Sequence, residues 1–198
     1  RPVWLAASTH QGKGEMVASA HIAMKRTKPN LLTIIVPRHP DRGPLIMKQL
    51  SALGLNVRLR SEGKLPDAET EIYIADTIGE MGLFYTLAPV AFVGGSLVRR
   101  GGQNPVEPIK LGAAVLTGPN FQNFRDSYEE LLKAGGAKQV DDAASLSAVA
   151  LALLNDNQAR SDMMARAERA LQGMSGALPK TLAALERYLP PKASIEHA

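Results

Sequence analysis

Short apolar runs alternate with stretches of helical period along most of this chain, and this alternation limits the folds it can adopt. Val3–Ala7 and Leu31–Val36 are nearly uninterrupted apolar runs, and each is followed by a stretch with apolar residues at helical spacing. Strands that are apolar on both sides need cover on both faces, which is typical of parallel sheets with helical crossovers. We therefore predict one doubly wound α/β domain built on a parallel sheet.

The same pattern predicts where the individual elements lie. The predicted strands are Val3–Ala7, Leu31–Val36, Val57–Leu59, Ile72–Ala75, Val90–Val93 and Ala113–Thr117. The predicted helices are Lys13–Arg26, Leu45–Leu53, Gly79–Leu87, Pro105–Leu111 and Phe124–Lys133, followed by a helical C-terminal tail of Ala143–Asn155, Gln158–Leu171 and Pro179–Tyr188. We assign residues 1–189 to the domain and expect residues 190–198, which begin with two prolines, to be a frayed, disordered tail.

Composition excludes several classes of protein. The 198 residues include no cysteine, which excludes disulfides, thiolate catalysis and cysteine-built zinc sites. The apolar runs are too short to cross a bilayer, so we expect a soluble chain. The sequence begins at Arg1 without a methionine or a signal-like stretch, and we expect it to be part of a larger protein.

Charge is distributed unevenly along the chain. Residues 1–60 carry ten Lys or Arg and two acidic residues, whereas the other 138 carry thirteen and seventeen. This asymmetry indicates either an anionic partner for the first part of the chain or a solvated basic surface. Nucleic acid is not the expected partner, because no basic run is interleaved with aromatic residues.

The residues just after each predicted strand are the informative ones, because ligands of open parallel sheets bind outside the carboxyl ends of the strands. After the first strand come Ser8, Thr9 and His10. Their hydroxyl and imidazole groups could contact an anion beside exposed helix amides. Ordinary helix capping by Ser8 or Thr9, with His10 in solvent, is the alternative.

After the second strand, Pro37 and Pro40 restrict the backbone around Arg38 and His39. A guanidinium fixed at the end of a strand suits a phosphate, to which it donates two parallel hydrogen bonds. The alternative is a surface turn in which Arg38 pairs with Asp41.

After the fourth strand, Thr77 and Glu80 have the spacing of a capping box, in which Glu80 bonds back to the first amide of a helix. Spacing alone favours this structural role. In the functional alternative the start of the helix holds a nucleotide, and Gly79 permits close approach of the backbone.

The longest loop, from Gly94 to Pro108, follows the fifth strand. It contains Gly94–Gly95 and then Ser96, with Gly101–Gly102 further along. Asn104, Pro105 and Glu107 also form a good helix start. A cap does not require four glycines, whereas glycine-rich turns that lead into helices form anion sites from backbone amides. The residues of this loop therefore favour a ligand-binding role over a helix cap alone.

Five motifs together resemble one family. They are S-T-H at Ser8–His10, V-P-R-H-P at Val36–Pro40, G-E-M at Gly79–Met81, A-F-V-G-G-S-L at Ala91–Leu97 and G-G-x-N-P-x-E-P at Gly101–Pro108. Their order and content resemble the C-terminal half of the 3-deoxy-D-manno-octulosonic acid (Kdo) transferases of lipopolysaccharide assembly. The likeness spans residues 3–124.

The resemblance implies a specific fold, donor and acceptor. It implies the C-terminal, Rossmann-like lobe of a GT-B glycosyltransferase, with CMP-Kdo as donor. A lipid A precursor would be the acceptor, bound largely by an N-terminal domain outside this chain, at the cytoplasmic face of the bacterial inner membrane. The nucleotide-binding residues implied are Pro37, Arg38, Gly79, Glu80, Met81, Asn104, Pro105, Val106 and Glu107, and the implied contacts to the donor sugar or phosphate are Ser8, His10, Gly94, Gly95, Ser96, Gly101 and Gly102.

The resemblance also implies where catalysis lies. The family's general base is a glutamate of the N-terminal lobe, so this chain alone is expected to bind CMP weakly and to transfer nothing. We expect no metal, since the sequence has no Asp-x-Asp motif or His cluster. Two positions depart from the family: Gln103 replaces the usual His, and Gln11–Glu15 has fewer glutamates than usual.

Two other functions fit part of this evidence. One is a GT-B enzyme that uses a UDP-sugar, such as an N-acetylglucosamine transferase or 2-epimerase. The other is a noncatalytic module whose basic first part binds anionic membrane lipid or a protein partner.

Overall fold

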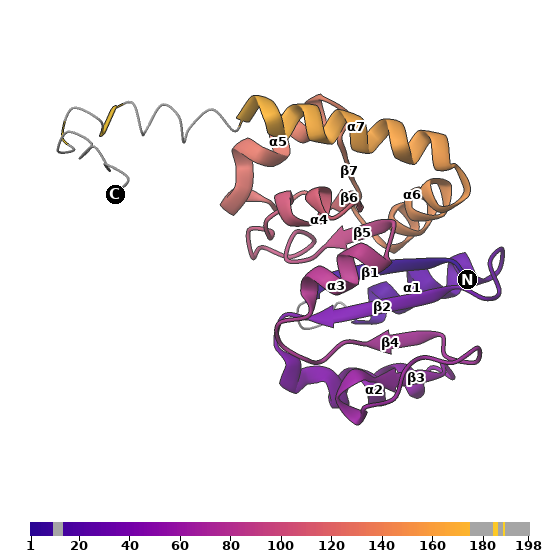
Figure 1. Ribbon diagram of the computed structural model, residues 1–198. Coiled ribbons are helices and arrows are strands. Elements are labelled where there is room, and N and C mark those ends of the chain that lie inside the picture. Colours follow the sequence, from indigo (N-terminus) through magenta and orange to yellow (C-terminus); the bar gives the residue numbers. More distant parts are fainter. Residues whose placement is uncertain (10–13, 175–183, 186–187, 189–198) are drawn as a thin grey trace, which may run out of the picture.

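The computed structural model describes residues 1–9, 14–174, 184–185 and 188 of the chain. Within these residues seven parallel strands form one sheet, in the order β3-β4-β2-β1-β5-β6-β7. The strands are β1 (Val3–Thr9), β2 (Leu32–Pro37), β3 (Val57–Leu59), β4 (Ile72–Ile74), β5 (Val90–Val93), β6 (Ala114–Thr117) and β7 (Ala137–Gln139). Figure 1 shows β3 and β7 at opposite ends of this sheet.

Helices cover both faces of the sheet. They are α1 (Gly14–Lys25), α2 (Gly43–Ser51), α3 (Met81–Leu87), α4 (Val106–Lys110), α5 (Arg125–Lys133), α6 (Ala143–Asn155) and α7 (Asn157–Met174). Alternate residues of β1 enter different cores: Trp4 and Ala6 pack with α1, α2 and α6, whereas Leu5 and Ala7 pack with α3. The β6 residue Val115 packs with α4 and α5. The doubly wound parallel fold is therefore confirmed.

Most predicted elements are present within a few residues; the helix predicted from Gly79, for example, begins at Met81. One strand was not predicted: β7 lies at the edge of the sheet, and its Lys138 and Gln139 are exposed. The predicted helix Pro179–Tyr188 falls mostly outside the described residues, as do residues 190–198.

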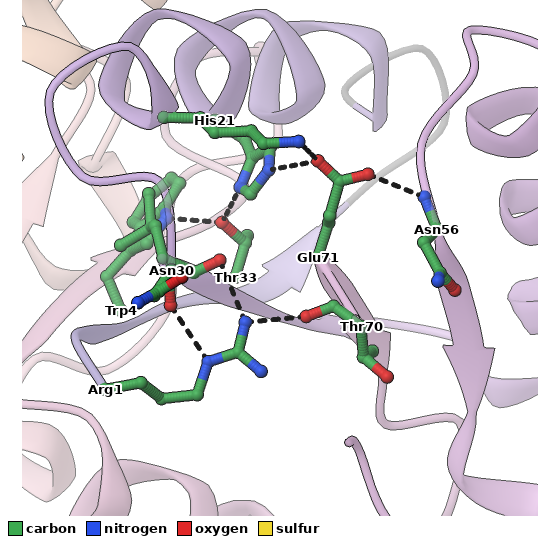
Figure 2. A network of polar contacts seen from close by, with 10 residues as sticks. Arg1, Trp4, His21, Asn30, Thr33, Asn56, Thr70 and Glu71 are labelled. Atoms are coloured by element: carbon green, nitrogen blue, oxygen red, sulfur yellow. Dashed lines mark hydrogen bonds and ion pairs between the residues drawn. The ribbon is translucent and has the colours of Figure 1, made fainter. Parts of the chain in front are cut away.

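At the amino ends of the strands lies a buried polar network, shown in Figure 2. The hydroxyl oxygen of Thr33 accepts a hydrogen bond from Trp4 Nε1 at 2.6 Å and lies 2.7 Å from His21 Nδ1. His21 Nε2 lies 3.8 Å from a carboxylate oxygen of Glu71, which also pairs with Lys25. This network joins α1 to β1, β2 and the residue before β4, at the edge of the sheet opposite the carboxyl ends of the strands.

Candidate functional site

A cavity of about 400 Å³ lies at the carboxyl edge of the sheet, among the loops that follow β1, β2 and β4 and the first turn of α3. It is lined by Ser8, Val36, Pro37, Arg38, His39, Pro40, Thr77, Ile78, Gly79, Met81 and Phe84. Five of these residues were predicted as ligand contacts: Ser8, Pro37, Arg38, Gly79 and Met81. Three loops far apart in sequence therefore meet where a doubly wound sheet places its ligands.

The loop after β2 presents a cation to this cavity. Thr9 of β1 pairs with Pro37 of β2, and the backbone nitrogen of Arg38 donates a hydrogen bond to the carbonyl of Thr9 at 3.0 Å. The Arg38 side chain is exposed, and among the described residues no carboxylate pairs with it. The alternative pairing with Asp41 is therefore not formed. The backbone at this position is held by the sheet, and the side chain extends from that fixed point.

The end of β1 has an unusual backbone. Ser8 has a φ of 51°, and it is the one described residue other than glycine with positive φ. Such a conformation is strained for a residue with a side chain and is found mostly where a site needs it. The next residue, Thr9, is buried, and its hydroxyl has no hydrogen-bond partner among the described residues. His10, the third residue of this motif, lies outside the described residues.

The loop after β4 does not form the predicted capping box. Glu80 stands at the N-cap of α3 and makes no side-chain cap bond. Its carboxylate instead accepts hydrogen bonds from Arg60, at 2.7 and 3.2 Å, and from the Thr77 hydroxyl. These bonds, that from Arg60 first, lower the pKa of Glu80 to about 2. The sequence spacing failed here because an arginine from another loop competes for the carboxylate.

The glycine-rich loop after β5 packs against the loop after β6. Gly95, Gly101 and Gly102 have φ values of 77°, 83° and 72°, which glycine adopts readily. Gly102 donates its amide to the carbonyl of Gly95 at 3.2 Å, and Gly94 donates to Ala7 at 2.8 Å. Both amides were predicted to donate hydrogen bonds to an anion, but in the structure they donate to carbonyl groups of the chain itself.

Ser96, in the same loop, also has an internal role. Its buried hydroxyl donates to the carbonyl of Val93 at 2.7 Å and accepts from the amide of Gly118 at 2.8 Å. A Cβ on Gly118 would lie 2.5 Å from the Ser96 carbonyl oxygen, so the two loops are in direct contact. Ser96 thus joins the loops after β5 and β6.

The start of α4 lies beside α3. The predicted start of this helix is wrong by one residue, because the N-cap is the buried Pro105 rather than Asn104, and the helix begins at Val106. The Asn104 side-chain oxygen still accepts a hydrogen bond from the Val106 amide at 2.9 Å. Glu107 is exposed, and its carboxylate lies 4.0 Å from where a Cβ on Gly82 would be. Asn104–Glu107 and Glu80 therefore lie around α3 but are not among the residues that line the cavity.

Among the described residues, no group of three or more His, Cys, Asp or Glu side chains is placed to hold a metal ion. None of the described helices is long and apolar enough to span a membrane.

Comparison with known proteins identifies the family. A 3-deoxy-D-manno-octulosonic acid transferase of Haemophilus influenzae is 37% identical over 190 residues, which are 96% of this chain and 44% of that protein. One of Bordetella pertussis is 37% identical over 193 residues, 96% of this chain and 45% of that protein. Among solved structures, the C-terminal CMP-Kdo binding domain of WaaA from Acinetobacter baumannii has 34% sequence identity to this chain, and the two structures superpose with a TM-score of 0.83. The match covers 87% of this chain and 90% of that domain. The chain belongs to the Kdo transferase family.

The chain spans a little under half the length of these curated Kdo transferases. More distant structures share the fold alone. The spinosyn rhamnosyltransferase SpnG is 15% identical with a TM-score of 0.56, and a UDP-N-acetylglucosamine 2-epimerase of Listeria monocytogenes is 12% identical with a TM-score of 0.54. No protein-family model matches the chain. The fold is that of a GT-B C-terminal domain, and the UDP-sugar alternative is not favoured.

Several cavity residues were not predicted as ligand contacts, among them His39, Thr77, Ile78 and Phe84. The first three lie within four residues of the end of a strand, beside residues that were predicted, so the rule for strand ends could have included them. Phe84 lies one turn into α3, and its contribution depends on how that helix packs.

Proposed function

We propose that this chain is the donor-binding domain of a Kdo transferase and that CMP-Kdo binds in the cavity at the carboxyl edge of the sheet. The observation that carries this proposal is that Arg38 lines that cavity and has no carboxylate partner among the described residues. It occurs in a chain 34% identical to a domain described as CMP-Kdo binding. Residues 1–189 constitute the domain, and an acceptor-binding half lies outside this chain.

Arg38 is the residue proposed to bind the phosphate of the nucleotide. When the bond between the sugar's anomeric carbon and the phosphate oxygen breaks, CMP leaves with the electron pair and its phosphate gains negative charge. A guanidinium stabilises that charge through parallel, charge-assisted hydrogen bonds. Because Pro37 and the bond to Thr9 fix the backbone, only the side chain of Arg38 has to be ordered when the phosphate binds.

The other residues are assigned around this contact. Gly79 and Met81 line the nucleotide site, with Glu80 holding their loop, while Asn104, Pro105, Val106 and Glu107 complete it from beside α3. The Glu107 carboxylate is the proposed acceptor for ribose hydroxyls. Ser8 and His10 are the proposed contacts to the donor sugar. The loop that contains Gly94, Gly95, Ser96, Gly101 and Gly102 is proposed to contact the sugar or phosphate through groups other than the Gly94 and Gly102 amides, which bond within the chain.

The remaining steps are assigned to the other half of the protein. It supplies the general base that takes the proton of the acceptor hydroxyl, and it binds the lipid A precursor at the cytoplasmic face of the inner membrane. No metal is required if Arg38 stabilises the leaving phosphate. This chain alone therefore binds CMP and transfers no Kdo.

Calorimetric titration with CMP and UDP tests the proposal. CMP should bind more tightly than UDP, and Arg38→Ala should weaken CMP binding by about ten- to a hundredfold, the range expected for a lost charge-assisted contact. Lys25→Ala is the matched control, because it removes a cation at the opposite edge of the sheet. Tighter binding of UDP, or equal losses in the two variants, would contradict the proposal.

A further inference from the structure

A one-turn 3-10 helix, η2 (Arg60–Glu62), lies against the wall of the proposed nucleotide site. It directly follows β3, which pairs with β4. The loop that follows β4 is the segment 76–80, and Thr77, Ile78 and Gly79 of that loop line the cavity. No residue of η2 is among those that line the cavity.

Four hydrogen bonds join η2 to the two ends of the 76–80 loop. Arg60 Nε and Nη2 donate to the two carboxylate oxygens of Glu80, at 3.2 and 2.7 Å. The Ser61 amide and hydroxyl donate to the two carboxylate oxygens of Asp76, at 2.9 and 2.7 Å. Both ends of the cavity-lining segment are therefore fixed by residues that stand next to each other in η2.

The middle of the 76–80 loop has little else to hold it. Ile78 is 87% exposed. Gly79 has a φ of 88°, and a Cβ placed there would meet nothing within 4 Å. Because apolar packing does not hold this segment, its conformation depends on the hydrogen bonds at Asp76 and Glu80.

The two ends of the loop differ in how firmly they are held. Asp76 is buried, and a Cβ on Gly43 at the start of α2 would lie 2.5 Å from its carboxylate, so α2 also confines it. Glu80 is partly exposed: its carboxylate is held by Arg60 and Thr77, and its carbonyl accepts a hydrogen bond from the Phe84 amide of α3 at 3.3 Å. Among the described residues, Arg60 is therefore the hydrogen-bond partner from outside this loop and α3 that holds the second end of the loop.

We propose that Arg60 is a positioning residue for the donor nucleotide, which holds the 76–80 loop in its binding conformation through Glu80 without contacting the ligand. This inference rests on the proposed function. A bidentate contact between a guanidinium and a carboxylate restricts both side chains, which a single hydrogen bond would not do. If loss of the contact leaves the binding conformation populated about a tenth of the time, the apparent Kd rises about tenfold.

Arg60→Gln tests the inference, with Arg58→Gln as the matched control. Arg58 lies two residues earlier, pairs with Asp67 away from the cavity and is exposed to a similar extent, 31% against 29% for the side chain of Arg60. We expect Arg60→Gln to raise the Kd for CMP about tenfold and Arg58→Gln to leave it within about twofold. Both should shift Tm by no more than about 3 °C, because partly exposed ion pairs contribute little to global stability.

Arg60→Lys and a double variant separate positioning from general structural damage. Lysine keeps the charge but cannot form the two parallel hydrogen bonds of a guanidinium, so Arg60→Lys should bind CMP with an affinity between those of the unchanged chain and Arg60→Gln. If Arg60→Gln does not fold, Arg60→Lys is the variant that tests the inference. Arg60→Gln combined with Glu80→Gln should weaken binding no more than the weaker-binding single variant, because both break the same contact. Additive losses, or a Kd unchanged in Arg60→Gln and Arg60→Lys, would overturn the inference.

Backbone ¹⁵N relaxation at Ile78 and Gly79 makes the outcome independent of the ligand. Arg60→Gln should lower the order parameters at these two positions, and Arg58→Gln should not. If the unchanged chain fails to bind CMP, the proposed function fails, and the order parameters alone then decide the role of Arg60. Unchanged order parameters in Arg60→Gln would overturn that role.

Discussion

The backbone of Gly94 lies directly against the carbonyl group of Ser8. The Gly94 amide donates to the carbonyl of the preceding Ala7 at 2.8 Å, and a Cβ on Gly94 would lie 2.5 Å from that oxygen and closer still to the Ser8 oxygen. Ser8 itself lines the cavity with its left-handed backbone. The end of β5 is thus packed so tightly on the end of β1 that the position requires glycine.

Gly94→Ala should therefore destabilise the domain by about 1–3 kcal/mol, because backbone atoms must move to admit the methyl group. Urea unfolding measures the change in the free energy of unfolding. Gly173→Ala is the control: Gly173 lies in α7 with nothing within 4 Å of its Cβ position, and alanine there should stabilise by about 0.5–1 kcal/mol. Similar effects at the two positions would show that close packing at Ser8 is not the cause.

Ser96→Ala should cost about 1–3 kcal/mol in the free energy of unfolding, because it leaves the buried amide of Gly118 without its acceptor. Ser19→Ala is the control. The Ser19 hydroxyl bonds to a carbonyl of its own helix at an exposed position, so its loss should change stability by less than about 0.5 kcal/mol. Equal effects on chemical denaturation would contradict the structural role of Ser96.

Stability should fall between about pH 6.5 and pH 4 because of His21. Burial lowers the pKa of this imidazole from 6.5 to about 4, partly opposed by Glu71. The unfolded chain therefore takes up a proton at a higher pH than the folded chain. The contribution of neutral His21 is present above pH 6.5 and is lost as the pH falls towards 4, by about 3 kcal/mol in total.

Thermal unfolding of the unchanged chain and of His21→Gln across pH 4–8 measures this effect. Between pH 7 and 8 the difference in unfolding free energy between the two chains should be constant. Below pH 6.5 the variant should lose less stability than the unchanged chain. Parallel curves over the whole range would show that another group causes the acid destabilisation.

The sequence predicted the architecture because the signal was local. A strand such as Val90–Val93 is apolar throughout, and the structure confirms it at the same boundaries. The strand Ala137–Gln139 escaped prediction because it is short and at the edge of the sheet, where Lys138 and Gln139 face solvent and leave no apolar pattern.

The site was predicted only in part because some of its contacts depend on strand order. Arg38 follows an apolar strand and was found by that rule. The pair between Arg60 and Glu80 joins residues that follow two different strands, β3 and β4, and only the pairing of those strands brings them together. The spacing of Thr77 and Glu80 instead predicted a helix cap, and this prediction was wrong because Arg60 binds the same carboxylate.

Amide chemical-shift mapping of the ¹⁵N-labelled chain during titration with CMP tests most directly whether the three loops form one nucleotide site. The largest saturable shifts should fall on Ser8, Arg38, His39, Gly79 and Met81, with a single shared Kd. Shifts confined to another hollow, such as the one that Lys138, Met163 and Arg166 line between α6 and α7, would contradict the proposed site. The absence of any saturable shift at the three loops would contradict it as well.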